Sequence, residues 1–159
     1  MKCLIFSDSH GDTYYMRRAI DKNPDAEVIF FLGDGISDAE AVALGDSCRM
    51  WIAVRGNCDS TVFFKNQCLN KNEEITLEGK KIFLTHGDFY GVKGGLENLT
   101  AAARARGADI VLFGHTHAAK EAYDDGLYIF NPGSIGGYEH SFGVLNISGA
   151  GILLSHGRL

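Results

Sequence analysis

Long apolar runs and clusters of positive charge are both missing from this sequence of 159 residues. The N-terminal apolar run stops at Asp8, well short of a signal h-region, and no later stretch approaches membrane-spanning length. The formal net charge is −5 with a pI near 5.6, and no segment is dense in Lys and Arg. We therefore expect a cytoplasmic protein that has neither a membrane nor duplex nucleic acid as a partner.

Cysteine and proline are also scarce. The cysteines at positions 3, 48, 58 and 68 form no CxxC pair and are too few for a disulfide scaffold, so we expect free thiols, with Cys3 in the core. Two prolines against twenty glycines exclude a Pro-rich chain and favour a fold with many tight strand ends. The length and the 45% hydrophobic content predict a single domain over residues 1–159.

Short apolar runs alternate with helix-like segments in the first part of the chain, and hairpin patterns follow later. Strands are predicted over residues 2–7, 27–32, 50–54, 73–77, 80–84 and 110–113, and helices over 13–22, 37–44 and 96–106. Two further hairpins are predicted to turn near residues 124–126 and 148–149. This mixture indicates an α/β sandwich of two sheets with outer helices.

Polar side chains that can bind metal follow the C-terminal ends of the predicted strands. They are Asp8, His10, Asp34, Asn57, His86, His115 and His117. Ligand sites in α/β sheets form at this edge, and the D-x-H and H-x-H spacings place alternate side chains of an extended loop on one side. Imidazole, carboxylate and amide donors together suit a divalent transition metal, and a carboxylate has two oxygens with which to bridge two ions.

Each of these residues also has an ordinary structural interpretation. Asp8, Asp34 and Asn57 taken singly fit turns and helix caps, and a single histidine carries little information. Four of the six histidines nevertheless occur in D-x-H, T-H-G and G-H-x-H contexts at strand ends, which turn formation does not require. The set as a whole therefore favours a metal site. His140 and His156 are assigned ordinary surface positions, although the Gly-rich loop before His140 leaves the rim of the site open to it.

The ordered motifs of the chain resemble those of a known family. They are Asp8-Ser9-His10-Gly11, Gly33-Asp34, Gly56-Asn57-Cys58-Asp59, Thr85-His86-Gly87, Gly114-His115-Thr116-His117 and Asn131-Pro132-Gly133-Ser134. In this order they resemble the calcineurin-like metallophosphoesterases, and among these the small single-domain phosphodiesterase branch of bacteria and archaea. The resemblance covers most of the chain.

The resemblance implies a four-layer αββα sandwich in which two mixed sheets are flanked by helices. It also implies two divalent transition-metal ions, with Mn²⁺ preferred and Ni²⁺, Zn²⁺ or Fe as alternatives. One ion would be held by Asp8, His10 and His117, the second by Asn57, His86 and His115, with Asp34 bridging the two. The segment 131–134 would close the sheet beneath the site.

The implied reaction is hydrolysis of a small-molecule or nucleotide phosphodiester by attack of a metal-bridging hydroxide. Asn57, Asp34 and His86 would be the catalytic residues, with Asn57 orienting the phosphate. A phosphomonoesterase and a non-catalytic protein-interaction scaffold of the same fold are the alternatives, and a homo-oligomer is left open. Because every ligand type is present, an enzyme is favoured over a scaffold.

Candidate substrate contacts lie near the metal ligands. They are Arg55, Cys58, Asp59 and Tyr90, with Lys93 and Tyr138 as further pocket candidates near Tyr90. Larger members of the family carry a histidine after the Gly-Asn pair, where this chain has Cys58, and that histidine can protonate the leaving oxygen. We therefore expect slower turnover and a preference for aryl esters, whose leaving groups need little protonation. Arg55 equally fits a structural pair, and Tyr90 equally fits rim packing.

Overall fold

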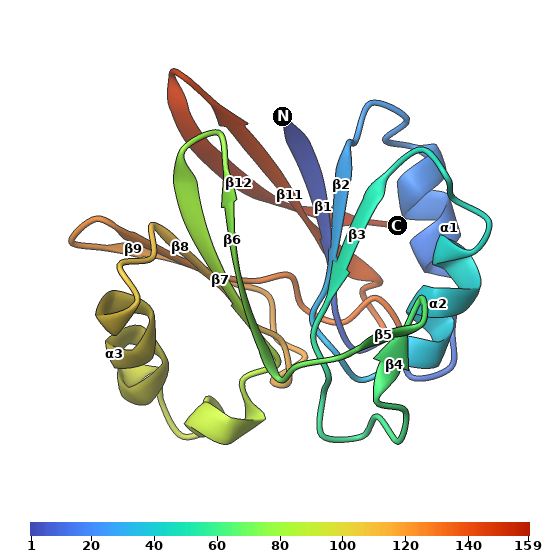
Figure 1. Ribbon diagram of the computed structural model, residues 1–159, viewed down its shortest axis with the longest axis horizontal. Helices are drawn as coiled ribbons and strands as arrows, with labels where there is room; N and C mark the ends of the chain where they lie inside the picture. The colour runs from blue at the N-terminus through green and yellow to red at the C-terminus, as the bar shows by residue number, and fades with distance from the viewer.

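The computed structural model describes residues 1–159 and has four layers in the order helix, sheet, sheet, helix (Figure 1). The strand order is β12-β11-β1-β2-β3 in the first sheet and β6-β7-β8-β10-β9 in the second. Both sheets contain parallel and antiparallel pairs. The predicted αββα sandwich of two mixed sheets is thereby confirmed.

The first sheet is built around three parallel strands: β1 (Lys2–Phe6), β2 (Val28–Phe31) and β3 (Met50–Ala53). Helices α1 (Tyr14–Asp21) and α2 (Ile36–Ala43) connect these strands and cover the outer face (Figure 1). The C-terminal hairpin of β11 (Ser141–Ser148) and β12 (Gly151–Arg158) extends the sheet, with β11 antiparallel to β1.

The second sheet begins with the hairpin of β6 (Asn72–Leu77) and β7 (Lys80–Thr85). Helix α3 (Glu97–Ala105) leads to β8 (Ile110–Leu112), which is parallel to β7. The hairpin of β9 (Lys120–Asp124) and β10 (Leu127–Asn131) completes the sheet. The carboxyl ends of β7 and β8 therefore lie at one edge of this sheet, and their loops face those of the first sheet (Figure 1).

Strands buried on both faces explain why the apolar runs are nearly continuous. In β1, Leu4 and Phe6 pack towards the helices of the first sheet, whereas Cys3 and Ile5 pack between the two sheets. In the second sheet Phe83 packs against the α3 side. Because alternate side chains of a strand point to opposite faces, the strands contribute to three apolar layers: one under α1 and α2, one between the sheets, and one under α3. Cys3 lies in the core as predicted, where burial raises the pKa of its thiol to about 12.

One small element lies outside the sequence-based prediction. Strands β4 (Phe63–Phe64) and β5 (Gln67–Cys68) pair as a hairpin whose turn residues, Lys65 and Asn66, both have positive φ. Strands of two residues carry no measurable periodicity, and the turn lacks the usual Asn-Gly signal. None of the helices is long and apolar enough to cross a membrane.

Candidate metal centre

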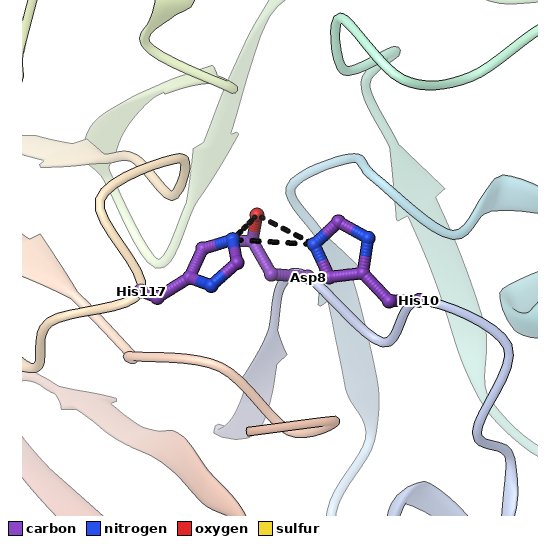
Figure 2. Close-up of side chains that lie close together, drawn as sticks. All are labelled: Asp8, His10 and His117. Atoms are coloured by element: carbon purple, nitrogen blue, oxygen red, sulfur yellow. Dashed lines mark hydrogen bonds and ion pairs between the residues drawn. The ribbon is translucent and has the colours of Figure 1, made fainter. Parts of the chain in front are cut away.

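Three of the predicted ligands form a first group at the shared edge of the sheets, and we call Asp8, His10 and His117 the outer group. Asp8 and His10 come from the loop after β1, and His117 comes from the loop after β8 (Figure 2). Nε2 of His117 lies 3.2 Å from Asp8 Oδ1, and Nε2 of His10 lies 3.8 Å from the same oxygen. The two Nε2 atoms are 3.2 Å apart, so three donor atoms converge on one small volume.

The carboxylate of Asp8 is fully buried, and its two oxygens have different surroundings. Oδ2 accepts hydrogen bonds from the Ser7 hydroxyl and from the backbone N–H of His115. Oδ1 is buried without any hydrogen-bond partner and faces the two imidazoles. A buried carboxylate oxygen without a donor is costly unless a cation satisfies it. The outer group therefore fits a divalent metal ion.

A second group consists of Asp34, His86 and His115, and we call it the inner group. Nε2 of His86 lies 3.3 Å from Asp34 Oδ2 and 3.2 Å from His115 Nδ1. Nδ1 of His86 lies 2.7 Å from the carbonyl oxygen of Leu32, and because a carbonyl only accepts, Nδ1 must carry the proton. In the neutral ring this leaves the lone pair on Nε2, the atom that points at the other donors.

The surroundings of Asp34 in the inner group favour the ionised form of its carboxyl group. Burial acts to raise the pKa of Asp34, but hydrogen bonds from His86 and from the Cys58 backbone outweigh it and lower that pKa. Burial acts to lower the pKa of His86, but the hydrogen bond with Asp34 and the charges of Asp8 and Asp34 raise it overall. Burial and the charge of His86 lower the pKa of His115, which keeps that imidazole neutral and able to coordinate.

Left-handed backbone marks the loops that carry these ligands. Positive φ angles occur at Asp8 (56°), His10 (47°), Asp34 (58°), His115 (65°) and His117 (58°). Such angles are uncommon outside glycine, and Asp and His are among the residues that adopt them most readily. Their concentration here means that the loops hold the ligands in conformations that a simple turn would not need.

Two glycines allow the loops of the inner group to approach closely. A Cβ on Gly33 would lie 2.5 Å from the backbone nitrogen of Gly56, and a Cβ on Gly56 would lie 2.5 Å from the backbone nitrogen of Asp34. Backbone cannot yield at these distances, so both positions require glycine. The Gly-Asp and Gly-Asn pairs of the sequence are therefore packing requirements as well as turn signals.

The carboxylate of Asp59 connects the same two loops. Its Oδ1 accepts the N–H groups of Gly35 and Ile36, and its Oδ2 accepts those of Asp34 and Gly56, all at 2.8 to 2.9 Å. With both oxygens occupied by backbone donors, Asp59 positions the Asp34 loop. This geometry favours a positioning role over the substrate contact expected from the sequence.

The other predicted site residues differ in their surroundings. Asn57 is exposed, and its amide nitrogen lies 3.4 Å from Cys58 Sγ. Cys58 lines a cavity of about 210 Å³ together with His10 and Asp34. Arg55 is half-buried at the end of β3, and its backbone N–H donates to Asn70.

Tyr90 is a predicted substrate contact that packs against the second sheet. It belongs to the 3-10 turn η1 (Asp88–Tyr90), and its ring stacks edge-on against Phe83 with the centroids 6.0 Å apart. Tyr90 thus packs against the second sheet, as its alternative interpretation expected. The neighbouring Phe89 is the exposed aromatic of this turn.

Several supporting residues were not predicted from the sequence. Asp38 in α2 accepts hydrogen bonds from the Ser9 hydroxyl at 2.6 Å and from the Gly11 backbone at 2.8 Å, and so restrains the loop that carries His10. Asp38 looks like an ordinary residue of a helical first turn, and no sequence signal distinguishes it. The hydroxyl of Ser134 donates to the Asp8 carbonyl at 2.7 Å, as the expected place of the 131–134 loop implies.

The two remaining histidines lie outside both groups. His140 stacks on Tyr15 with ring centroids 3.3 Å apart. His156 is half-buried, stacks on Phe130, and donates from Nε2 to the carbonyl of Asn131 at 2.7 Å. Both side chains are half-buried, so the expected surface position holds only in part for each of them: His140 is covered by Tyr15, and β12 turns His156 towards β10.

A family model agrees with this arrangement. Residues 1–150 match the model of the calcineurin-like phosphoesterase superfamily domain. The match includes both ligand groups and the loops that position them.

Individual relatives and solved structures agree as well. A probable metallophosphoesterase, YsnB, from Bacillus subtilis is 36% identical over 135 residues, covering 85% of this chain and 75% of the relative. The phosphodiesterase YfcE of Escherichia coli K12 is 31% identical over 168 residues, covering 92% and 88%. The crystal structure of a predicted phosphoesterase from Streptococcus pneumoniae matches with a TM-score of 0.81 at 22% identity, covering 99% of this chain and 88% of the other.

Proposed function

The chain belongs to the calcineurin-like phosphoesterase superfamily, and on this premise we propose that the outer and inner groups are the active site of a metal-dependent phosphodiesterase. Its substrates are small-molecule or nucleotide phosphodiesters. The observation that carries the proposal is the buried, unpartnered Oδ1 of Asp8, which faces the Nε2 atoms of His10 and His117. A buried negative oxygen between two imidazoles requires a cation, and metal ions provide it.

Two metal ions fit the donor set better than one. The outer group supplies one carboxylate and two imidazoles, and the inner group supplies the same, so together they exceed the four ligands of a closed tetrahedral site. Asn57 would add an oxygen ligand beside the inner group, and Asp34 would serve both ions. Bound there, divalent ions would supply Lewis-acid activation of water and neutralise charge on the phosphoryl oxygens. Mn²⁺ is the proposed metal because the donor set combines carboxylate and amide oxygens, which suit Mn²⁺, with imidazoles, which suit transition metals in general.

The residues of the chain supply orientation and proton control. Leu32 fixes the tautomer of His86, and this presents the Nε2 lone pair towards the site. Asn57 is exposed beside Cys58, where its amide can donate to a phosphate oxygen. The Cys58 thiol keeps its proton at neutral pH, because the Asp34 carboxylate raises the pKa of Cys58 both as a hydrogen-bond acceptor and as a charge.

Hydrolysis of matched esters by the purified full chain tests this function. The protein is treated with a chelator, dialysed, and assayed with an aryl phosphodiester and with the corresponding aryl phosphomonoester in the presence of Mn²⁺, Ni²⁺, Zn²⁺ or Mg²⁺. We expect metal-dependent hydrolysis with the diester as the better substrate. A faster monoester reaction would assign a phosphomonoesterase instead, and full activity without metal would refute the proposed site.

A further inference from the structure

A cavity beside the metal centre is not used by the mechanism above. Its volume is about 480 Å³, within the range of small-molecule pockets. Backbone of the Gly94-Gly95 pair forms one wall, and the loop after His117 forms the other. The lining includes Val92, Lys93, Phe113, Thr116 and Lys120.

The cavity shares its walls with the ligand loops. Thr116 stands between His115 and His117 in the chain, and its hydroxyl accepts a hydrogen bond from Asn131 that holds this loop in place. On the other side, a Cβ on Gly87 would contact Val92 at 2.9 Å, which places that pocket residue against the residue following His86. A substrate held at the metal centre therefore has this cavity within reach of one of its ester arms.

The chemistry of the lining is apolar below and cationic at the rim. Val92 and Phe113 are buried and form an apolar floor, whereas Lys93 and Lys120 are exposed. No carboxylate belongs to the lining, although the protein carries a net charge of −5. The carboxylate of Glu97 lies against Gly95 at the edge of the pocket. A flat apolar group that carries a negative charge complements these features.

We propose that this cavity, which we call the lysine pocket, binds one ester arm of the phosphodiester substrate, and that the arm is a ring bearing an anionic substituent. The ring lies on the floor of Val92 and Phe113, and the anion lies between Lys93 and Lys120. This assignment rests on the proposed function, because it extends the same active site to a defined class of substrate.

Paired substrates test the charge requirement. Methyl 4-carboxyphenyl phosphate and methyl 4-carbamoylphenyl phosphate have nearly the same shape but differ by one negative charge on the ring. Hydrolysis adds water across the P–O(aryl) bond of either diester and releases methyl phosphate and the phenol. The readout is the ratio of kcat/KM for the charged diester to that for the neutral one, measured at fixed Mn²⁺. A change that acts only on the metal centre alters both rates and leaves this ratio constant.

Charge-neutralising variants should change the ratio in opposite directions. We expect Lys93→Gln and Lys120→Gln each to lower it about threefold, and the double variant about tenfold, as for partly exposed ion pairs. Glu97→Gln should raise it about twofold. Lys22→Gln is the matched control, because Lys22 is an exposed lysine at the C-terminal end of α1, and α1 covers the first sheet, away from the lysine pocket. A ratio unchanged in the double variant would overturn the lysine pocket.

A binding measurement separates failure of the pocket from failure of the proposed function. Methyl (4-carboxyphenyl)phosphonate, in which a P–C bond replaces the P–O(aryl) bond that is cleaved in the diester, is titrated into the isotope-labelled full chain, with and without Zn²⁺, and amide chemical shifts are recorded. We expect the Gly94, Gly95 and Thr116 amides to shift in the wild type and to shift much less in the Lys93→Gln/Lys120→Gln variant. If neither diester is hydrolysed but these amides shift, the pocket stands and the phosphodiesterase assignment falls. Shifts confined to other regions would refute the pocket even in an active enzyme.

Discussion

The outer and inner groups contain the same residue types but are supported differently by the fold. In the outer group the side chains of His10 and His117 are 40% and 49% exposed, and only Asp8 is fixed by buried hydrogen bonds. In the inner group the side chains of His86 and Asp34 are 0% and 3% exposed. His86 is further oriented by Leu32, and the Asp34 loop is held by Asp59.

The inner group is therefore the more preorganised of the two, and the outer group is the more accessible to solvent. The inner ligands are already close to one another within the buried part of the fold, because Nε2 of His86 lies 3.3 Å from Asp34 Oδ2 and the N–H of Cys58 donates to Asp34 Oδ1. The outer ligands leave the Asp8 charge uncompensated and depend on two side chains that lose rotational freedom when they bind. We therefore infer that the inner group forms the more rigid half of the centre, and that the outer group is the half that a cation stabilises most.

Metal removal should give the largest effect. After exhaustive chelation we expect the hydrolysis of an aryl phosphodiester to fall at least about 1000-fold, because the proposed mechanism uses a metal-activated water and no protein nucleophile. Mn²⁺ should restore the rate better than Ca²⁺, since Ca²⁺ prefers all-oxygen sites. Calorimetric titration of the demetallated protein should resolve two unequal binding steps. A single step of unit stoichiometry would contradict the two-ion proposal.

Exchange of single ligands should distinguish the bridging position from a terminal one. Asp34→Asn removes a charge that would serve both ions, and we expect kcat to fall at least about 100-fold, the upper end of what loss of an outer-shell partner alone costs. Asn57→Asp keeps an oxygen donor at an exposed position and should cost less. Metal content measured on both variants provides the control. Equal kcat values for wild type and Asp34→Asn would refute the bridging assignment.

Much of this architecture is readable in the sequence because the strands are buried on both faces. The continuous apolar runs around Phe6, Phe31 and Leu84 predict strands, and the polar residues that follow them predict the edge at which the ligands meet. The same reasoning cannot find the β4–β5 hairpin, since Phe63 and Phe64 make too short a pattern.

The residues that position the ligand loops are harder to predict from the sequence than the ligands themselves. Asp59 is adjacent to Cys58 in the sequence, and that position suggested a substrate contact. Its role depends on four N–H groups brought together by two separate loops. Asp38 is equally ordinary in the sequence and gains its role only when α2 packs beside the Ser9 loop. Side chains that act through tertiary hydrogen bonds leave no local signal.

Stability measurements can compare these two supports directly. In Asp59→Asn, one oxygen becomes an amide that faces two backbone donors, so we expect the free energy of unfolding to fall by about 3 kcal/mol. In Asp38→Asn, the remaining oxygen can still accept from Ser9 and Gly11, and we expect a loss of about 1 kcal/mol. Urea denaturation of the metal-free variants gives both values. The reverse order would mean that the outer loop, and not the inner one, carries the greater share of stability.

The smallest effect is expected at position 58, where larger relatives are expected to carry a histidine. Without an imidazole near the leaving oxygen, the rate should fall steeply as the pKa of the leaving group rises, and alkyl esters should be poor substrates. Cys58 lines the cavity that includes His10 and Asp34, so an imidazole placed there would be at the metal centre. Cys58→His should therefore flatten the dependence on leaving-group pKa, with the largest gain for the poorest leaving groups.

The surroundings of Asp59 limit how large that gain becomes. A catalytic imidazole works best when a carboxylate orients it, and Asp59 is the adjacent carboxylate in the chain. Both of its oxygens already accept backbone N–H groups, so it has no strong acceptor position left for a new ring. We therefore expect Cys58→His to accelerate alkyl diesters by less than about tenfold, well below the hundredfold that a well-placed general acid contributes.

The measurement is a series of aryl and alkyl phosphodiesters at fixed metal concentration, with Cys58→Ala as the control for loss of the thiol. Parallel slopes for wild type and Cys58→His would place residue 58 out of reach of the leaving oxygen, whereas a hundredfold gain would show that a group other than Asp59 orients the ring.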